Sequence, residues 1–176
     1  MKTTEEIFNL LKEKFGESII EFKTGVPVED FIVVNPFEID KVCTFLRDTD
    51  SYQFNNLMNL SGVDDANGKK ITGEQGEVKL EGRTFSLFYH LESMSLKQKV
   101  TLAVRMPGEN PEVSSVSEIW RSADWHEREA FDMFGIKFLN HPDLRRILMP
   151  YDWEAGYPLR KDYKNPEFYQ GMKVPY

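Results

Sequence analysis

The segment Phe85–Met106, FSLFYHLESMSLKQKVTLAVRM, decides the fold class of this 176-residue chain. Apolar side chains recur at every second position along Phe85–Leu91 and again along Val100–Met106. This period of two is typical of strands that bury one face. Ser93–Lys97 is short enough to connect the two runs as a hairpin. The segment therefore predicts an antiparallel hairpin with one face against the core.

Outside this hairpin, the sequence predicts further strands and helices. Apolar side chains with a helical period indicate helices at Thr3–Phe15, Phe37–Asp48 and Ser114–Phe134, the last ending at Gly135. Short β-like runs lie at Ser18–Lys23, Asp30–Val34 and Tyr52–Leu60. The glycine-rich stretch Gly62–Gly82 indicates a variable surface loop or a hairpin tip. This order predicts an α+β fold in which helices pack on a mostly antiparallel sheet.

The residues after Gly135 differ in composition from the rest of the chain. They contain five of the nine prolines and five of the seven tyrosines. The prolines exclude a long helix, and the aromatic content is unlike that of a disordered tail. We predict an α+β domain over residues 1–135 and an extended C-terminal arm over residues 136–176. Such an arm either binds a partner or wraps back over its own domain, and the sequence leaves both open.

The composition excludes several classes of function. The net charge of −7, from 22 basic and 29 acidic residues, argues against nucleic-acid binding. One cysteine, Cys43, and three histidines cannot supply an iron–sulfur cluster or a structural zinc site. We expect Cys43 to be a small buried residue on a helix. Neither G-x-G-x-x-G nor G-x-x-x-x-G-K-[ST] occurs, so the chain carries no nucleotide-binding fingerprint.

The sequence also bears on the relation to a membrane. No apolar run approaches the length of a membrane span, and the N-terminus lacks the pattern of a targeting segment. We therefore expect a protein on the cytoplasmic side that reaches a membrane only through its partners.

The densest polar cluster lies near the end of the third predicted helix and just after it. A metal or acid–base site there would draw on His126, Glu129, His141 and Asp143. However, Ala130 occupies the position where the H-E-x-x-H metal motif requires its second histidine. Arg128 and Asp132 have the i, i+4 spacing of an ordinary helical ion pair. Structural pairing is therefore favoured, and a stand-alone metal-dependent enzyme is the alternative.

Arg145 and Arg146 are adjacent, so on an extended chain their side chains point to opposite sides. One is expected to pair within the chain, for example with Asp143 or with the face carrying Glu127 and Glu129. The other is then free to reach a carboxylate of a partner, for which the planar guanidinium fork is well suited.

Three stretches resemble the signatures of one family. Residues 127–136 read EREAFDMFGI, residues 141–148 read HPDLRRIL, and DW at 152–153 precedes PLRKDY at 158–163. Together they are similar to the 30-kDa subunit, also called the C subunit, of the proton-pumping NADH:quinone oxidoreductase (complex I). The chain departs from the family pattern in two places. Asn140 stands where a glycine is common, and Lys164-Asn165 delay the proline that usually follows the Asp-Tyr pair. The motif residues expected to bind partners are Glu127, Arg128, Glu129, Asp132, Gly135, His141, Pro142, Asp143, Arg145, Arg146, Asp152, Trp153, Pro158, Arg160 and Asp162.

The resemblance implies a structural subunit with no catalytic residues, cofactor or metal ligands of its own. Iron–sulfur clusters, FMN and quinone would belong to neighbouring subunits. The expected partner is chiefly the quinone-site subunit, known as the D subunit, with the B and I subunits nearby and no homo-oligomer. The implied role is to dock onto this quinone-site subunit and to support assembly of the electron-transfer module. The implied location is peripheral, on the cytoplasmic side of the bacterial inner membrane.

Two further readings stay open beside this one. Membrane-bound hydrogenases and other quinone- or ferredoxin-linked complexes use homologous subunits that the motifs do not separate from complex I. An interaction module outside any respiratory complex is also compatible with the composition. The proteins that co-purify with the chain would decide between these readings.

Overall fold

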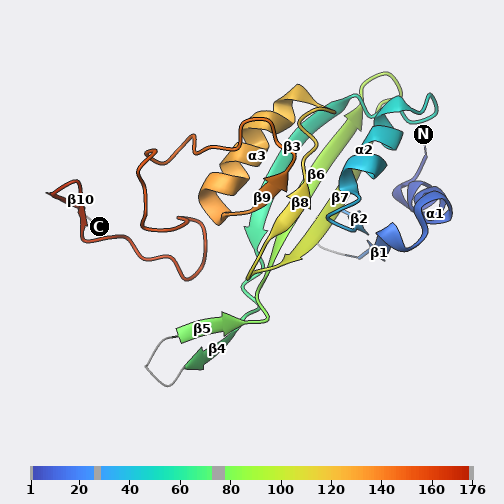
Figure 1. Cartoon of the computed structure of the whole chain (residues 1–176). Helices are drawn as coiled ribbons and strands as arrows, with labels where there is room; N and C mark the ends of the chain where they lie inside the picture. Colours follow the sequence, from blue (N-terminus) through green and yellow to red (C-terminus); the bar gives the residue numbers. More distant parts are fainter. Residues whose placement is uncertain (1, 26–28, 73–77, 175–176) are drawn as a thin grey trace.

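The computed structural model describes residues 2–25, 29–72 and 78–174. Its centre is a five-stranded sheet in the order β1-β2-β7-β6-β3 (Figure 1). The β2 and β7 strands pair in parallel, and the other neighbours pair antiparallel. The predicted α+β class with a mostly antiparallel sheet is therefore confirmed. The strands of this sheet are β1 Ile19–Lys23, β2 Phe31–Val34, β3 Asn56–Asp64, β6 Thr84–Ser93 and β7 Gln98–Pro107.

The predicted central hairpin is confirmed by β6 and β7. Their ladder runs without interruption from the pair Thr84–Pro107 to the pair Ser93–Gln98. One face of the hairpin is buried and mostly apolar, because side chains that alternate along a strand share a face. On that face lie Phe85, Leu87, Tyr89, Leu91, Val100, Leu102, Val104 and Met106.

Three helices contribute to the same core as this sheet face. They are α1 Thr4–Phe15, α2 Ile39–Asp48 and α3 Arg121–Phe134, with a short 3-10 turn, η1 Gly16–Ser18. α1 begins at the expected capping box, in which Thr3 and Glu6 each bond the other's backbone N–H. Cys43 is buried on α2, as predicted. None of the described helices is long and apolar enough to cross a membrane.

The predicted start of the third helix at Ser114 is wrong. Residues Glu112–Ser114 form a strand, β8, which pairs in parallel with β9, Lys137–Leu139. The hydroxyl of Ser115 and the N–H of Val116 bond the carboxylate of Glu127. These bonds hold the chain out of a helical path, so α3 begins only at Arg121.

The strand predicted at Tyr52–Leu60 lies four residues further along the chain, as β3 at Asn56–Asp64. Tyr52 and Phe54 are buried, but they lie in the turn after α2, where Gln53 has a positive φ of 46°. The glycine-rich stretch contains a two-stranded hairpin, β4 Lys69–Thr72 and β5 Val78–Glu81, that projects from one end of the sheet (Figure 1). Residues 73–77 of the stretch predicted as a loop or hairpin tip lie outside the described residues.

The C-terminal part of the chain runs away from the sheet on the side of α3 (Figure 1). After β9, the described residues form only the small hairpin of β10 Phe168–Tyr169 and β11 Met172–Lys173. The first residues of the predicted arm belong to the core, because Ile136 and Phe138 are buried in it. The division of the chain after residue 135 stays a prediction.

Candidate docking site

Asp132 on α3 fixes the path of the chain where it leaves the α+β core. Its fully buried carboxylate accepts the backbone N–H groups of Ile147, Leu148 and Met149 at 3.0, 2.7 and 2.9 Å. The guanidinium of Arg146 adds an ion pair of 2.6 Å. Burial alone would raise the pKa of Asp132, but these four donors outweigh it, so the pKa lies below the ordinary value.

Arg146 therefore pairs neither with Asp143 nor with the face carrying Glu127 and Glu129, the partners expected from the sequence. Its partner is Asp132, and its own side chain is only 17% exposed. Arg145 pairs with Asp143 at 2.8 Å, as one of the expected pairs, yet its side chain remains 70% exposed. The two arginines do point in different directions, one into the molecule and one to solvent. Both arginines therefore form ion pairs within the chain, and Arg145 is the one of the two that is exposed to solvent.

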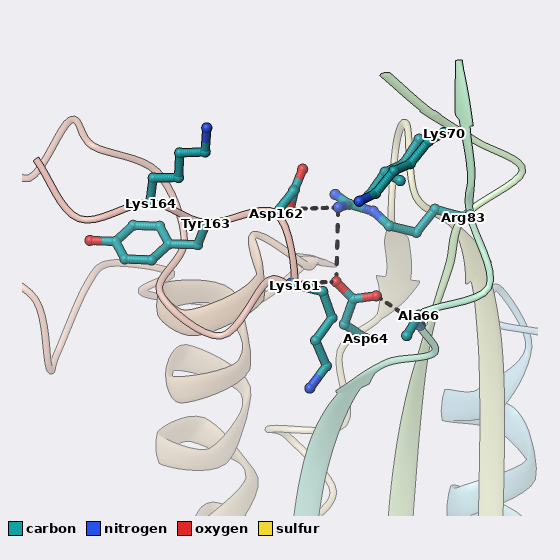
Figure 2. A pocket seen from close by; sticks show the side chains of 10 residues that line it. Asp64, Ala66, Lys70, Arg83, Lys161, Asp162, Tyr163 and Lys164 are labelled. Atoms are coloured by element: carbon teal, nitrogen blue, oxygen red, sulfur yellow. Dashed lines mark hydrogen bonds and ion pairs between the residues drawn. The ribbon is translucent and has the colours of Figure 1, made fainter. Parts of the chain in front are cut away.

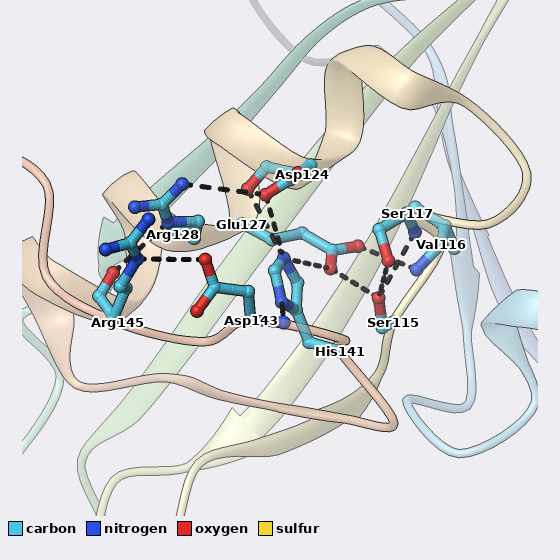
Figure 3. A network of polar contacts seen from close by, with 9 residues as sticks. All are labelled: Ser115, Val116, Ser117, Asp124, Glu127, Arg128, His141, Asp143 and Arg145. Atoms are coloured by element: carbon cyan, nitrogen blue, oxygen red, sulfur yellow. Dashed lines mark hydrogen bonds and ion pairs between the residues drawn. The ribbon is translucent and has the colours of Figure 1, made fainter.

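Glu127 and His141 form a second buried connection (Figure 3). The Glu127 carboxylate accepts the Ser115 hydroxyl at 2.6 Å and the Val116 N–H at 2.7 Å. His141 Nδ1 accepts the N–H of Asp143, which places the proton of a neutral imidazole on Nε2. That Nε2 lies 3.3 Å from the backbone carbonyl of Asp124 and 3.8 Å from Glu127 Oε2, so the hydrogen bond to Asp124 joins the start of the arm to α3.

The environment of Glu127 changes its acidity. Burial raises the pKa of Glu127 to about 7, although its bonds to Ser115 and Val116 oppose the shift. The carboxylate of Asp124 raises the pKa further, and it lies 3.5 Å from His141 Nε2. The glutamate is thus a buried group that changes charge near neutral pH.

The neighbouring helix residues divide between the interior and the solvent. Arg128 is buried, donates from Nε to the carbonyl of Arg145 at 3.3 Å, and lies over the ring of Trp125. Glu129 is exposed on the opposite side of α3, and His126 is partly exposed. Glu129 therefore does not share a site with His141.

Gly135 ends α3 and makes room for the returning arm. Its φ of 73° lies in the left-handed region, which glycine adopts without cost. A Cβ at this position would lie 2.5 Å from the ring of Tyr157 and 2.6 Å from Arg160 Nη2. Arg160 in turn donates from Nε to the carbonyl of Phe134 at 2.6 Å. The close packing here depends on the missing side chain.

A third anchor lies at the end of β3 (Figure 2). The buried carboxylate of Asp64 accepts the backbone N–H of Lys161 at 2.9 Å and that of Ala66 at 3.1 Å. Asp162 pairs with the buried guanidinium of Arg83 at 2.6 Å. Pro158 is half-buried, and the segment that follows it is thereby bound to the end of the sheet.

Two further motif residues, Asp152 and Trp153, contact the far end of the arm. The Asp152 carboxylate accepts the Tyr169 hydroxyl at 2.6 Å and Gln170 Nε2 at 2.9 Å. The hydrogen bond from Tyr169 lowers the pKa of Asp152, with Gln170 adding to the effect. The Trp153 and Tyr169 rings lie 5.2 Å apart. Pro142 is exposed in the turn after His141.

The outer side of the arm carries large apolar side chains that face solvent. Tyr151 is 94% exposed, the largest fraction among them. The others, from 51% to 64% exposed, are Leu148, Leu159, Phe168 and Met172. The arm is thus bonded to its own domain, which is one of the two sequence alternatives, and it also exposes large apolar side chains. Binding of a partner by the arm stays a prediction. We call these five side chains the outer arm surface.

The proposed metal ligands are not brought together. His126 and Glu129 lie apart from the pair of His141 and Asp143, and Asp143 contacts the imidazole through its backbone N–H. Within residues 2–25, 29–72 and 78–174, no group of three or more histidine, cysteine or acidic side chains is arranged to hold a metal ion. The fit to a metal site is therefore poor.

No sequence pattern predicted the contacts of Asp64, Arg83, Ser115 and Asp124. Asp64 bonds a residue 97 positions away, so no local spacing reveals the contact. The only signal was that Asp64 and Arg83 are charged and lie within a few residues of predicted strands. Asp64 was assigned to a surface loop, whereas it is buried at the end of β3.

Comparison with known proteins identifies the family. A family profile described as "Respiratory-chain NADH dehydrogenase, 30 Kd subunit" matches residues 32–169. The chain belongs to this 30-kDa subunit family. It is 39% identical over 170 residues to the C subunit of the NADH-quinone oxidoreductase of Chlorobium phaeobacteroides, covering 96% of this chain and 93% of that protein. It is 40% identical over 173 residues to the corresponding protein of Chloroherpeton thalassium, covering 98% of this chain but only 65% of that protein.

Solved structures share the fold of this 30-kDa family member. A trypsin-resistant fragment of Nqo5 aligns with a TM-score of 0.55 at 23% identity, covering 78% of this chain and 98% of the fragment. A chain of an archaeal membrane-bound sulfane sulfur reductase, described as a respiratory membrane complex, aligns with a TM-score of 0.61 at 20% identity, covering 93% and 86%. At these identities the likeness extends to the fold alone.

Proposed function

We propose that this chain is a non-catalytic structural subunit of the hydrophilic arm of a proton-translocating NADH:quinone oxidoreductase. It docks onto the D subunit, which carries the quinone site, and supports assembly of the electron-transfer module. The B and I subunits lie nearby, and the iron–sulfur clusters, FMN and quinone belong to neighbouring subunits. The chain is peripheral on the cytoplasmic side of the inner membrane and contacts the membrane only through the complex.

The observation that carries this proposal is an arm that is bonded to the domain and still exposes large apolar side chains. Asp132 and Asp64 use buried carboxylates to hold the arm against the domain, and the imidazole of His141 bonds the backbone carbonyl of Asp124 on α3. A monomeric protein gains nothing by ordering a chain that exposes Tyr151 and Leu148 to water. Exposed aromatic and apolar side chains on a pre-ordered segment are typical of an interface, because little entropy is lost on binding.

The family motifs support a scaffold rather than a reacting centre. Glu127, Arg128 and Asp132 are buried and bonded to the arm or to neighbouring loops. Arg145 is the exposed motif arginine, and its guanidinium suits a carboxylate of a partner.

The outer arm surface provides the test. Tyr151→Ala combined with Leu148→Ala should reduce the amount of assembled complex, since truncating an interface anchor typically costs about 2 kcal/mol or more. The matched control is Met94→Ala combined with Phe37→Ala, which removes side chains that are 67% and 53% exposed on the domain. Assembly is measured by native-gel abundance and activity by NADH:quinone turnover in the same membranes.

The expected result is a parallel fall in assembly and activity, with normal turnover per assembled complex. Full assembly with abolished turnover would overturn the scaffold role. Equal losses in the control variant would show that the domain surface, not the arm, mediates docking.

A related membrane-bound hydrogenase or another quinone- or ferredoxin-linked complex is the second candidate. This second candidate is considered because a chain of the archaeal respiratory membrane complex has the same fold. Mass spectrometry of the subunits that co-purify with the tagged chain separates the two, because only complex I brings NADH-oxidising subunits.

A further inference from the structure

A groove of about 750 Å³ lies between the base of the β4–β5 hairpin and the arm (Figure 2). Its wall on one side comes from Lys70 and Leu80 of the hairpin. On the other side lie Lys161, Tyr163 and Lys164 of the arm. The groove is therefore built from segments far apart in the sequence, and it exists only while the Asp64 anchor holds the arm in place.

The groove is basic, although the chain as a whole has a net charge of −7. Four cationic side chains line it, and the opposing carboxylates are those of Asp64 and Asp162. Both carboxylates are already engaged by Arg83 and by the N–H of Lys161. Among the described residues, Lys70, Lys161 and Lys164 form no ion pair.

Arg83 forms a rigid element of this groove. Its side chain is 7% exposed and its guanidinium lies 4.7 Å from the centre of the Phe85 ring. The Nη1 atom contacts Asp162 at 2.6 Å and Asp64 at 3.8 Å, but it makes no hydrogen bond of normal geometry within the described residues. The two carboxylates of the groove therefore hold this guanidinium in place.

We propose that this groove binds an acidic peptide segment of a neighbouring subunit in the assembled complex. The inference rests on the proposed function, which supplies the neighbours. Carboxylates complement the three lysines, and the apolar parts of Leu80 and Tyr163 suit the stem of an extended chain. A groove bounded on two sides by the hairpin and the arm fits an extended peptide segment.

The test is zero-length carbodiimide cross-linking of the complex purified from membranes, followed by mass spectrometry. This reagent joins a lysine to a carboxylate only where the two are in direct contact. Lys70, Lys161 or Lys164 should be joined to an aspartate or glutamate of another subunit. Cross-links from these lysines confined to carboxylates of the same chain, in a complex that retains the chain, would overturn the groove proposal alone.

A pair of variants adds a quantitative measurement. Lys161→Gln with Lys164→Gln should lower retention of the chain in the complex about twofold to tenfold, and the loss should shrink at high salt. Lys97→Gln with Lys99→Gln removes the same charge at the opposite end of the β6–β7 hairpin and should leave retention unchanged. Equal losses in both pairs would overturn the proposal, because the effect would then follow net charge.

Two further outcomes are decisive. If the purified chain floats with vesicles of anionic phospholipid and the Lys161→Gln, Lys164→Gln pair abolishes flotation, the groove serves a lipid and the peptide proposal is wrong. If the tagged chain co-purifies with no other subunit, the proposed function fails and the groove proposal fails with it.

Discussion

The α+β domain and the C-terminal arm of this chain are stabilised by different interactions. In the domain, three helices and one sheet face meet in a single apolar core. In the arm, large apolar side chains face solvent, and buried carboxylates on the domain hold the backbone. Apolar burial is non-directional and spreads over many residues, whereas a buried carboxylate fixes a few backbone N–H groups in one geometry. The arm should therefore respond to single polar substitutions that the domain tolerates.

The largest expected effect lies in the core. Phe54→Ala removes a fully buried ring and should lower the free energy of unfolding by about 3–5 kcal/mol. Phe168→Ala is the matched change on the arm, where the ring is 59% exposed, and should change it by less than about 0.5 kcal/mol. Urea unfolding followed by circular dichroism measures both. A large loss for Phe168→Ala would show that the arm is also held by apolar burial.

The second prediction concerns pH and uses Glu127. Its pKa is raised to about 7 in the folded protein from an ordinary value of 4.5. Between these values the folded chain keeps a proton that the unfolded chain has released, so stability from this group falls as pH rises. The loss is on the order of 3 kcal/mol and is complete above about pH 7.

Glu127→Gln should therefore remove this loss. Urea midpoints of the wild type and the variant, measured from pH 4.5 to 7.5, should diverge as the pH rises, with the wild type falling relative to the variant. Glu129→Gln, an exposed change on the same helix, should leave the wild-type profile intact. Parallel profiles for wild type and Glu127→Gln would mean that Glu127 is ionised throughout.

The difference between domain and arm also explains what the sequence could predict. The β6–β7 hairpin and α1 were found because alternation and a capping box are local patterns. The start of α3 was missed because Ser115 and Val116 bond Glu127 rather than continuing a helical ladder. Such competition depends on a residue brought close by folding.

The site was predicted less completely than the fold. The motifs located Asp132 and Arg146 but not their pairing, and they gave no hint of Asp64 or Arg83. An ion pair across 79 positions and a hydrogen bond across 97 positions follow no sequence period, so only the folded chain reveals them. The exposed outer arm surface was likewise beyond sequence reasoning, because composition does not tell which side of an extended chain is covered.

The third prediction removes one charge from the strongest arm anchor. Asp132→Asn keeps the shape but weakens bonds to three N–H groups and to Arg146, at a cost of about 1.5–3 kcal/mol. Local opening of the arm should then make trypsin cleavage at Arg145–Arg146 roughly 10 to 100 times faster. Asp143→Asn, which affects only an exposed pair, should change the rate little. Unchanged cleavage in Asp132→Asn would place the arm's stability elsewhere.

The smallest expected effect separates backbone strain from packing against the arm. Gly135 and Gly82 both adopt left-handed backbone, with φ of 73° and 70°. Alanine at either position should cost about 1 kcal/mol from the backbone alone.

At Gly82 no atom of the described residues lies within 4 Å of the added Cβ, so we expect that cost to be the whole effect. At Gly135 the Cβ would meet the Tyr157 ring at 2.5 Å, and displacing the ring should also disturb the bond from Arg160 to Phe134. The excess for Gly135→Ala over Gly82→Ala should be about 1 kcal/mol in urea unfolding, accompanied by faster trypsin cleavage at Arg160 only in the Gly135 variant. Equal costs and equal cleavage would mean that the arm yields freely at Tyr157, and that its hold on the domain depends on the carboxylate anchors alone.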